Sequence, residues 1–235
     1  MINFLSFFKR RTRFRADVFI SAGGGCKVAF YLRKFRLRTF SSPFDWLGLY
    51  TLSDINACFE EDFANFFKEY EEVPSTTNKR WVRDRQNGMR SMHDFSFEES
   101  LECGYERFIT QKRRRFENLK RHIKASKHIC FVSCRQDNYA EFEKFLKQMQ
   151  NFHHAKYTLI NIRLNIRHDL NCKKMKKVEL EWGEKLYFIE YLFNDTHKKG
   201  EAYKRAWLGN TKLWHKIMHS LSLEKGVSAY FVKLT

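Results

Sequence analysis

A cysteine that follows three consecutive glycines is the local pattern in this chain best suited to chemistry. Gly23, Gly24 and Gly25 end a short apolar run, and Cys26 opens a segment with helical spacing. A thiol at a helix N-terminus lies at the positive end of the helix dipole, which lowers its pKa and favours the nucleophilic thiolate. The glycines would let a substrate carbonyl or phosphate approach the backbone N–H groups closely. The pattern predicts a reactive thiol or an anion site. The alternative, that Cys26 is simply a small buried residue on a packed turn, remains open.

A nucleophilic thiol also needs a base, most often a histidine that the fold brings near. The chain has nine histidines. His93 is the first candidate, because it follows the loop Asn87-Gly88 and is flanked by Asp94. His168-Asp169 is a second pair of the same kind.

Asp45 lies between two large aromatic residues in the box Pro43-Phe44-Asp45-Trp46. An acid in such surroundings is either buried with a partner or directed into a site. A structural role, such as an ion pair with Arg38, is favoured slightly over a catalytic one. Phe44 and Trp46 are expected in the core or in a pocket wall.

The glycine turn can also be interpreted as a phosphate site. It lacks the dinucleotide and Walker patterns, since Lys27 is followed by Val28, so only a looser cradle is expected. Arg135 comes directly after a predicted strand, where open α/β sheets place their ligands. If the sheet is parallel, Cys26 and Arg135 lie at the same edge. The candidate substrate-binding residues are Ser21, Gly23, Gly24, Gly25, Lys27, Trp46 and Arg135.

Hydrophobic periodicity predicts the elements that position these residues. Strands and helices are expected to alternate along the chain, which favours a mainly parallel sheet covered on both faces. The fold class is therefore α/β, a single layered domain that is Rossmann-like rather than a true papain fold. It would span residues 17–235 and follow a basic N-terminal segment, residues 1–16. The expected strands are 18–22, 128–133, 156–164 and 185–193, and the expected helices are one from Cys26 onward, 54–72, 99–126, 139–149 and a last one marked by Trp207, Trp214, Ile217 and Leu221.

Composition narrows the class of protein. The 235 residues carry a net charge of +17, and 43% are hydrophobic and 17% aromatic, which excludes intrinsic disorder. No apolar run reaches the ~18 residues that span a bilayer. The N-terminus lacks the order of a secretory signal, so a cytoplasmic location with reduced thiols is expected. The apolar and basic segment 4–11 could still contact an anionic membrane surface, such as an inner membrane.

Several boxes resemble one bacterial family, catalogued as "putative papain-like cysteine peptidases" of unknown function. Residues 19–35, Leu37-Arg38 and 42–46 are similar to its opening, and 92–95 resembles its His-Asp-Phe box. The basic helix 106–124 with the strand after it, and the segment 207–214, resemble its second half. The resemblance covers about residues 17–219, and the first box is its most specific part.

The resemblance implies a Cys/His pair carried by Cys26 and His93, with Asp45 or Asp94 as an orienting acid. In that scheme the glycine turn would hold an oxyanion. The three glycines before Cys26 depart from the family's usual approach to its cysteine. The predicted parallel sheet also departs from papain-like folds, which pack a helical lobe against an antiparallel sheet.

Three functions remain open from the sequence. The first is a cysteine-dependent hydrolase or acyl-transfer enzyme, with an acyl or anionic small-molecule substrate and no cofactor or metal. The second is a transferase or modifying enzyme acting on phosphorylated or nucleotide-activated sugars in surface-glycan assembly. The third is a polyanion- or nucleic-acid-binding protein, which the net charge of +17 suggests. It is ranked last, because no RNP, helix-turn-helix or zinc-finger signature accompanies the charge.

Overall fold

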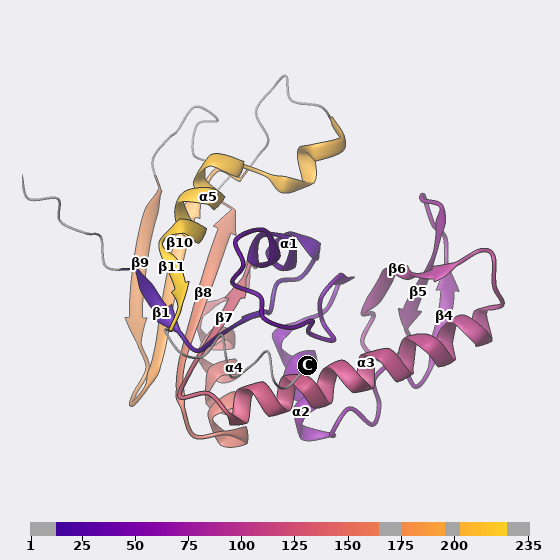
Figure 1. Ribbon diagram of the computed structural model, residues 1–235, viewed down its shortest axis with the longest axis horizontal. Coiled ribbons are helices and arrows are strands. Elements are labelled where there is room, and N and C mark those ends of the chain that lie inside the picture. The colour runs from indigo at the N-terminus through magenta and orange to yellow at the C-terminus, as the bar shows by residue number, and fades with distance from the viewer. Residues whose placement is uncertain (1–12, 165–174, 196–202, 225–235) are drawn as a thin grey trace, which may run out of the picture.

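The computed structural model describes residues 13–164, 175–195 and 203–224, so segment 4–11 and the His168-Asp169 pair lie outside the described residues. Helices and strands alternate over most of this length (Figure 1). The strands are β1 (Phe14–Ala16), β2 (Val18–Ser21), β3 (Leu47–Gly48), β4 (Tyr70–Val73), β5 (Lys79–Asp84), β6 (Arg90–Ser96), β7 (His128–Ser133), β8 (Lys156–Leu164), β9 (Lys176–Glu181), β10 (Leu186–Phe193) and β11 (Leu221–Leu223). The helices are α1 (Cys26–Lys34), α2 (Leu52–Glu60), α3 (Leu101–Lys124), α4 (Tyr139–Phe152), η1 (Tyr203–Leu208, a 3-10 helix) and α5 (Thr211–His219).

A central five-stranded sheet has the order β2-β7-β8-β10-β9. The first four strands pair in parallel, and β9 pairs antiparallel to β10 at one edge. Successive residues of β7 alternate between two cores, because side chains of a strand point to opposite faces. Phe131 packs with α3 and α4 on one face, and Cys130 packs with α1 and α5 on the other. The continuous apolar run of β7 is therefore the consequence of burial on both faces.

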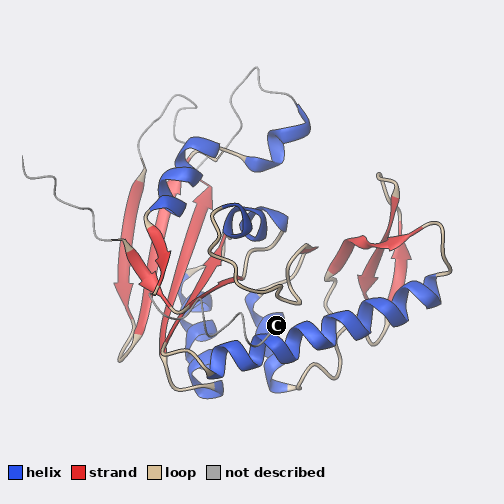
Figure 2. Cartoon of the chain, viewed as in Figure 1, coloured by secondary structure: helices blue, strands red, loops and turns tan. Residues whose placement is uncertain are grey.

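The α/β class is confirmed, whereas a single, mainly parallel sheet is not. A second sheet of four antiparallel strands, β3-β6-β5-β4, lies beside the central one, and β1 and β11 form a separate parallel pair. Figure 2 shows the two larger sheets as distinct groups of strands on either side of the molecule. Residues 14–16, at the end of the predicted N-terminal segment, form β1.

The helix predicted over 54–72 is wrong in its second half. The helix α2 ends at Glu60, and the chain then turns with Asp62, Phe63 and Phe67 at positive φ before β4 begins. Non-glycine residues rarely adopt this conformation, and here burial compensates for it, because Phe63 and Phe67 are almost fully buried. The predicted last helix is likewise divided, into η1 and α5 around Gly209 at a φ of 66°.

The helix α3 spans the molecule and underlies both sheets (Figure 1). Its 24 residues correspond to about 36 Å, at 1.5 Å per residue. Ser100 caps its N-terminus by accepting a hydrogen bond from the backbone N–H of Cys103. Its first half packs against β6 and its second half covers the central sheet. Among the described helices, none is both long and apolar enough to cross a bilayer.

Candidate active site

Cys26 is the first residue of α1, directly after the turn that ends β2. Gly25 precedes the helix with extended backbone, and the first turn carries no acidic residue. An added Cβ at Gly23 would meet Val28 Cγ2 at 2.6 Å, so only glycine allows α1 to pack this closely on the turn. By contrast, an added Cβ at Gly25 would meet nothing within 4 Å. The turn thus fixes Cys26 at the C-terminal edge of the central sheet and leaves its backbone open to a ligand.

His93 comes from the other sheet, and a bulge in β6 places it. Val82 pairs with Ser91 and Arg80 with Phe95, so three residues of β6 lie opposite the single Trp81 of β5. Such bulges break the alternation of side chains and redirect them, often beside active sites. Here the bulge covers residues 92–94 and directs the ring of His93 toward Cys26.

The thiol and the imidazole are in contact. Cys26 Sγ lies 3.4 Å from His93 Nε2, although 67 residues separate them in sequence. The ring of His93 packs edge-on against Trp46, with 6.4 Å between ring centroids. In the described part of the chain, no carboxylate contacts this ring. The bulge and Trp46 are therefore the features that hold His93 in place.

Burial raises the pKa of the Cys26 thiol above its ordinary value. The backbone N–H of Cys26 and the charge of Lys112 lower this pKa, while Asp45 and Asp94 raise it. The direction is opposite to that expected from the helix dipole alone, because desolvation is the largest effect. The thiol is thus predominantly protonated until a base removes its proton.

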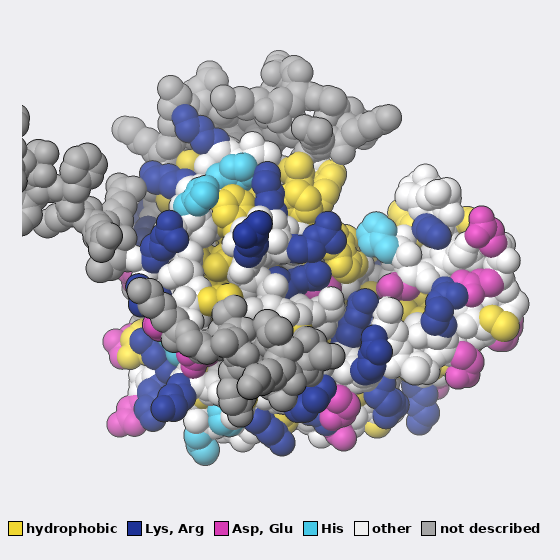
Figure 3. Space-filling model, in the orientation of Figure 1, with side chains coloured by type: hydrophobic (Ala, Val, Ile, Leu, Met, Phe, Trp, Pro, Cys, Tyr) yellow, Lys and Arg dark blue, Asp and Glu magenta, His cyan; other side chains and the backbone are white. Residues whose placement is uncertain are grey.

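A cavity of about 620 Å³ opens at this pair. The described walls of the cavity are largely apolar and aromatic. Figure 3 shows apolar side chains gathered between the part of the molecule that holds the central sheet and the part that holds the second sheet. Trp207, 45% exposed, packs edge-on against Phe30 and forms part of the cavity wall. Among the described residues, no group of three or more His, Cys, Asp or Glu is placed to hold a metal ion. The described lining is Gly24, Gly25, Cys26, Lys27, Val28, Trp46, His93, Cys134 and Trp207.

A fully buried lysine on α3 connects the two halves of the site. Lys112 Nζ donates to the carbonyl oxygen of Pro43 at 3.1 Å and lies 3.5 Å from that of Asp45. It also forms an ion pair with Asp94 at 3.4 Å. The loop that carries Trp46 and the strand that carries His93 therefore share one ammonium group. Burial lowers the pKa of Lys112, while Asp94 favours its charged form.

Asp45 and Asp94, the two candidate orienting acids, contact other groups than His93. The buried Asp45 accepts from Arg38 Nη1 at 2.7 Å and from the backbone N–H of Ser42 at 3.0 Å, which confirms the predicted ion pair with Arg38. Asp94 accepts from Ser91 Oγ at 2.7 Å as well as from Lys112. Both carboxylates thus brace the loop and strand around the site.

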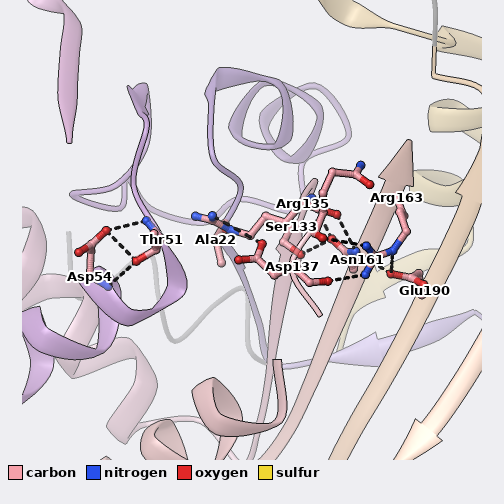
Figure 4. Close-up of polar contacts among 10 residues, drawn as sticks. Ala22, Thr51, Asp54, Ser133, Arg135, Asp137, Asn161, Arg163 and Glu190 are labelled. Carbon is pink, nitrogen blue, oxygen red and sulfur yellow. Dashed lines mark hydrogen bonds and ion pairs between the residues drawn. The ribbon is translucent and has the colours of Figure 1, made fainter. Parts of the chain in front are cut away.

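Arg135 lies at the same edge of the sheet as Cys26, as a parallel arrangement of β2 and β7 predicts. Its Nε donates to the carbonyl oxygen of Ala22 at 2.8 Å (Figure 4), and its guanidinium stacks over the ring of Tyr50. Arg135 therefore supports the glycine turn from behind and is not among the described cavity walls. Ser21 and Gly23 are also buried behind the turn, whereas Gly24 and Gly25 face the cavity.

Arg135 is itself held by a buried polar network on the central sheet (Figure 4). Asn161 accepts from the backbone N–H of Arg135 at 3.0 Å and donates to its carbonyl oxygen at 3.1 Å. The fully buried Glu190 accepts from Asn161, from Arg163 and from the hydroxyl of Tyr139. Because the buried carboxylate of Glu190 is paired with Arg163 and bonded on both oxygens, the network can fix the edge of the sheet rigidly.

Lys27 points into the cavity but is already paired. Its Nζ lies 2.6 Å from Asp195 Oδ2, and Asp195 Oδ1 accepts from Trp214 Nε1 at 2.8 Å. The charge of Lys27 is thus largely neutralised within the protein, which weakens it as a phosphate ligand. The cavity consequently favours uncharged or apolar groups next to Cys26.

Sequence reasoning missed Lys112 and Trp207 as site residues. Lys112 was assigned to a basic stretch, yet it stands midway between Phe108 and Phe116 on the apolar stripe of α3, and that spacing marks it as buried. Trp207 belongs to one of the family-like boxes, but nothing in its spacing indicates that it lines the same cavity as Cys26.

Comparison with known protein families matches residues 17–171 to the family described as "Putative papain-like cysteine peptidase". The matched region contains Cys26, His93 and Lys112, while Trp207 lies beyond it. The chain has no significant match among curated proteins or solved structures. Since the match covers well over half of the sequence, the chain belongs to the family of putative papain-like cysteine peptidases.

Proposed function

We propose that this protein is a cysteine-dependent hydrolase or acyl-transfer enzyme in which Cys26 is the nucleophile and His93 the general base. The observation that carries the proposal is the 3.4 Å contact between Sγ and Nε2 at the mouth of a cavity. A base positioned in this way contributes about 10²- to 10⁴-fold to the rate. Membership of the peptidase family supports the same chemistry.

The proposed reaction uses the contact between Cys26 and His93. His93 Nε2 accepts the thiol proton as Sγ attacks the carbonyl carbon of the substrate, because the raised pKa of Cys26 leaves little free thiolate. The negative oxygen that develops is stabilised by free backbone N–H groups in the first turn of α1. The imidazolium then protonates the leaving group, and a thioester remains on Cys26. Water, or another acceptor in a transferase, attacks the thioester with His93 again acting as the base.

The test combines thiol alkylation and hydrolysis. We expect His93→Ala to slow the alkylation of Cys26 by iodoacetamide at least tenfold at pH 7, as measured by mass spectrometry. The exposed Cys103 of the same molecule is the internal control, and its rate should not change. Equal rates at Cys26 in the parent and in His93→Ala would overturn the assignment of the base.

The second arm uses a panel of activated acyl esters with apolar acyl groups. Both Cys26→Ala and Cys26→Ser should lose hydrolysis, since a serine hydroxyl ionises far less readily than a thiol at neutral pH. Retention of hydrolysis in Cys26→Ser would argue against thiol catalysis and overturn the assignment of Cys26 as the nucleophile. Circular dichroism of each variant checks that the fold is intact.

A further inference from the structure

Lysines gather at the edge of the central sheet that lies opposite Cys26. Lys127 directly precedes β7, Lys156 opens β8, and Lys185 directly precedes β10. These three strands are neighbours in the sheet. Lys124, the last residue of α3, lies beside them. In Figure 3, Lys and Arg side chains lie along the lower margin, with some Asp, Glu and His among them.

These lysines line one concavity of about 520 Å³, which we call the basic concavity. Hydrogen bonds place the backbones of three of them side by side: the N–H of Lys156 donates to the carbonyl of Lys127 at 2.9 Å, and the N–H of Tyr157 to that of Lys185 at 2.8 Å. Because neighbouring strands lie about 4.8 Å apart, the three side chains start within about 10 Å of one another. The described residues that line the basic concavity are Lys124, Ala125, Ser126, Lys127, His153, His154, Ala155, Lys156 and Lys185.

The positive charges of this concavity are only partly offset within the described residues. None of the four lysines forms an ion pair with an acid there. Asp17 is close, but its carboxylate accepts from the backbone N–H groups of Lys127 and His128 instead. Lys156 lies over the ring of Tyr187 at 4.5 Å, and Lys124 lies over a phenylalanine ring, so aromatic faces rather than carboxylates fix their stems.

The negative ends of two helix dipoles offset only part of the positive charge of the basic concavity. The helices α3 and α4 both end at the basic concavity, and each C-terminus is equivalent to about half a negative charge. Together they offset about one of the four ammonium charges, and the carboxylate of Asp17 beside Lys127 offsets about one more. Ammonium groups held this close together repel one another, so a group that is only partly offset indicates a ligand that relieves the repulsion.

We propose that the basic concavity binds an anion that carries two or more phosphate groups. Ammonium groups from three successive strands can contact successive phosphates at once, whereas a single carboxylate would engage only one or two of them. Lysine serves well here, because it contacts phosphate as a point charge and needs no planar geometry. The site is separate from Cys26, so this proposal does not depend on the proposed function.

The experiment measures binding of inorganic tripolyphosphate to the full chain by isothermal titration calorimetry. In the triple variant Lys127→Gln/Lys156→Gln/Lys185→Gln we expect the Kd to rise at least tenfold. A second triple variant, Lys144→Gln/Lys212→Gln/Lys216→Gln, removes three lysines on α4 and α5 outside the concavity. Since both triples reduce the net charge by three, they separate a local site from the general attraction of a +17 protein. The second triple should change the Kd less than twofold.

Flotation with vesicles containing cardiolipin, whose headgroup carries two phosphates, distinguishes the source of the phosphates. Binding of tripolyphosphate that is lost only in the first triple assigns a soluble ligand. Binding of vesicles alone, lost only in the first triple, assigns a lipid headgroup. An equal effect of the two triples, or no binding of either probe by the parent protein, would overturn the proposal. Unchanged thermal unfolding and Cys26 alkylation in the first triple show that the fold and the distant site are intact.

Discussion

Replacing Lys112 by methionine tests whether one buried ammonium group holds the two halves of the site together. The change removes the hydrogen bond to Pro43 and the ion pair with Asp94. A hydrogen bond from a charged donor contributes about 1.5–3 kcal/mol, and loss of one partner of a buried ion pair costs about 3–5 kcal/mol. Asp94 is partly exposed and keeps its bond to Ser91, and methionine avoids burying a charge, so both figures are reduced. We expect the free energy of unfolding to fall by about 2 kcal/mol.

The same variant makes a prediction with a definite sign for the thiol. The charge of Lys112 lowers the pKa of Cys26, and that of Asp94 raises it. The midpoint of the pH profile of Cys26 alkylation should therefore move upward in Lys112→Met and downward in Asp94→Asn. A purely structural role of the lysine would not move the two profiles in opposite directions.

Urea denaturation and the alkylation profile are the two assays. Lys120→Met is the matched control, because Lys120 is on the same helix but pairs with the exposed Asp62 and Glu117. Surface pairs of this kind contribute less than about 1 kcal/mol. The reasoning is refuted if Lys112→Met is no more destabilising than Lys120→Met, or if both alkylation profiles shift in the same direction.

Three further outcomes test other parts of the structure. Burial lowers the pKa of His122 to about 4, below its value of about 6.5 in the unfolded chain. Between these two pH values only the unfolded state binds a proton on His122. The free energy of unfolding should therefore fall as the pH falls from about 6.5 to about 4. In His122→Phe we expect this loss to shrink by about 1–2 kcal/mol in urea titrations at several pH values; an unchanged slope would be inconsistent with a neutral, buried ring. Glu190→Ala leaves Arg163 without its carboxylate and should lower the free energy of unfolding by about 3 kcal/mol, whereas Glu190→Gln should recover part of it; equal effects of the two would contradict the network. Thr51→Ala removes the capping box with Asp54 and should lower the free energy of unfolding by about 1 kcal/mol. A loss below about 0.5 kcal/mol, the size of an ordinary surface substitution, would show that the cap adds nothing.

The parts of the fold that the sequence predicts best are those with continuous apolar character. Strands 128–133 and 156–164 match β7 and β8, because burial on both faces leaves an unbroken apolar run. The second sheet was missed, since β5 is short, half-exposed and rich in charge, with the sequence Lys-Arg-Trp-Val-Arg-Asp. Local periodicity cannot identify such a strand, because its partners and the helix α3 beneath it stabilise it.

For the site, the sequence predicts which residues meet but not what holds them. Cys26 and His93 carry recognisable chemistry, and the structure places them in contact. The bulge of β6 has no signature in the residues themselves, because it depends on the register with β5. From the sequence alone, the neighbouring Asp94 is the natural candidate for the partner of His93. In the structure, the carboxylate of Asp94 pairs with Lys112.

The division of the site between two sheets has a consequence for how the protein loses activity. Cys26 is supported by the five-stranded sheet, while His93 is supported by a smaller sheet of four short strands. Small units with much exposed backbone open locally at a lower free energy than the whole protein. On gentle heating, the hairpin β5–β6 is therefore expected to open before the central sheet melts. The proposed catalysis would then stop through a partial, reversible opening, with Cys26 still in place and the larger core still folded.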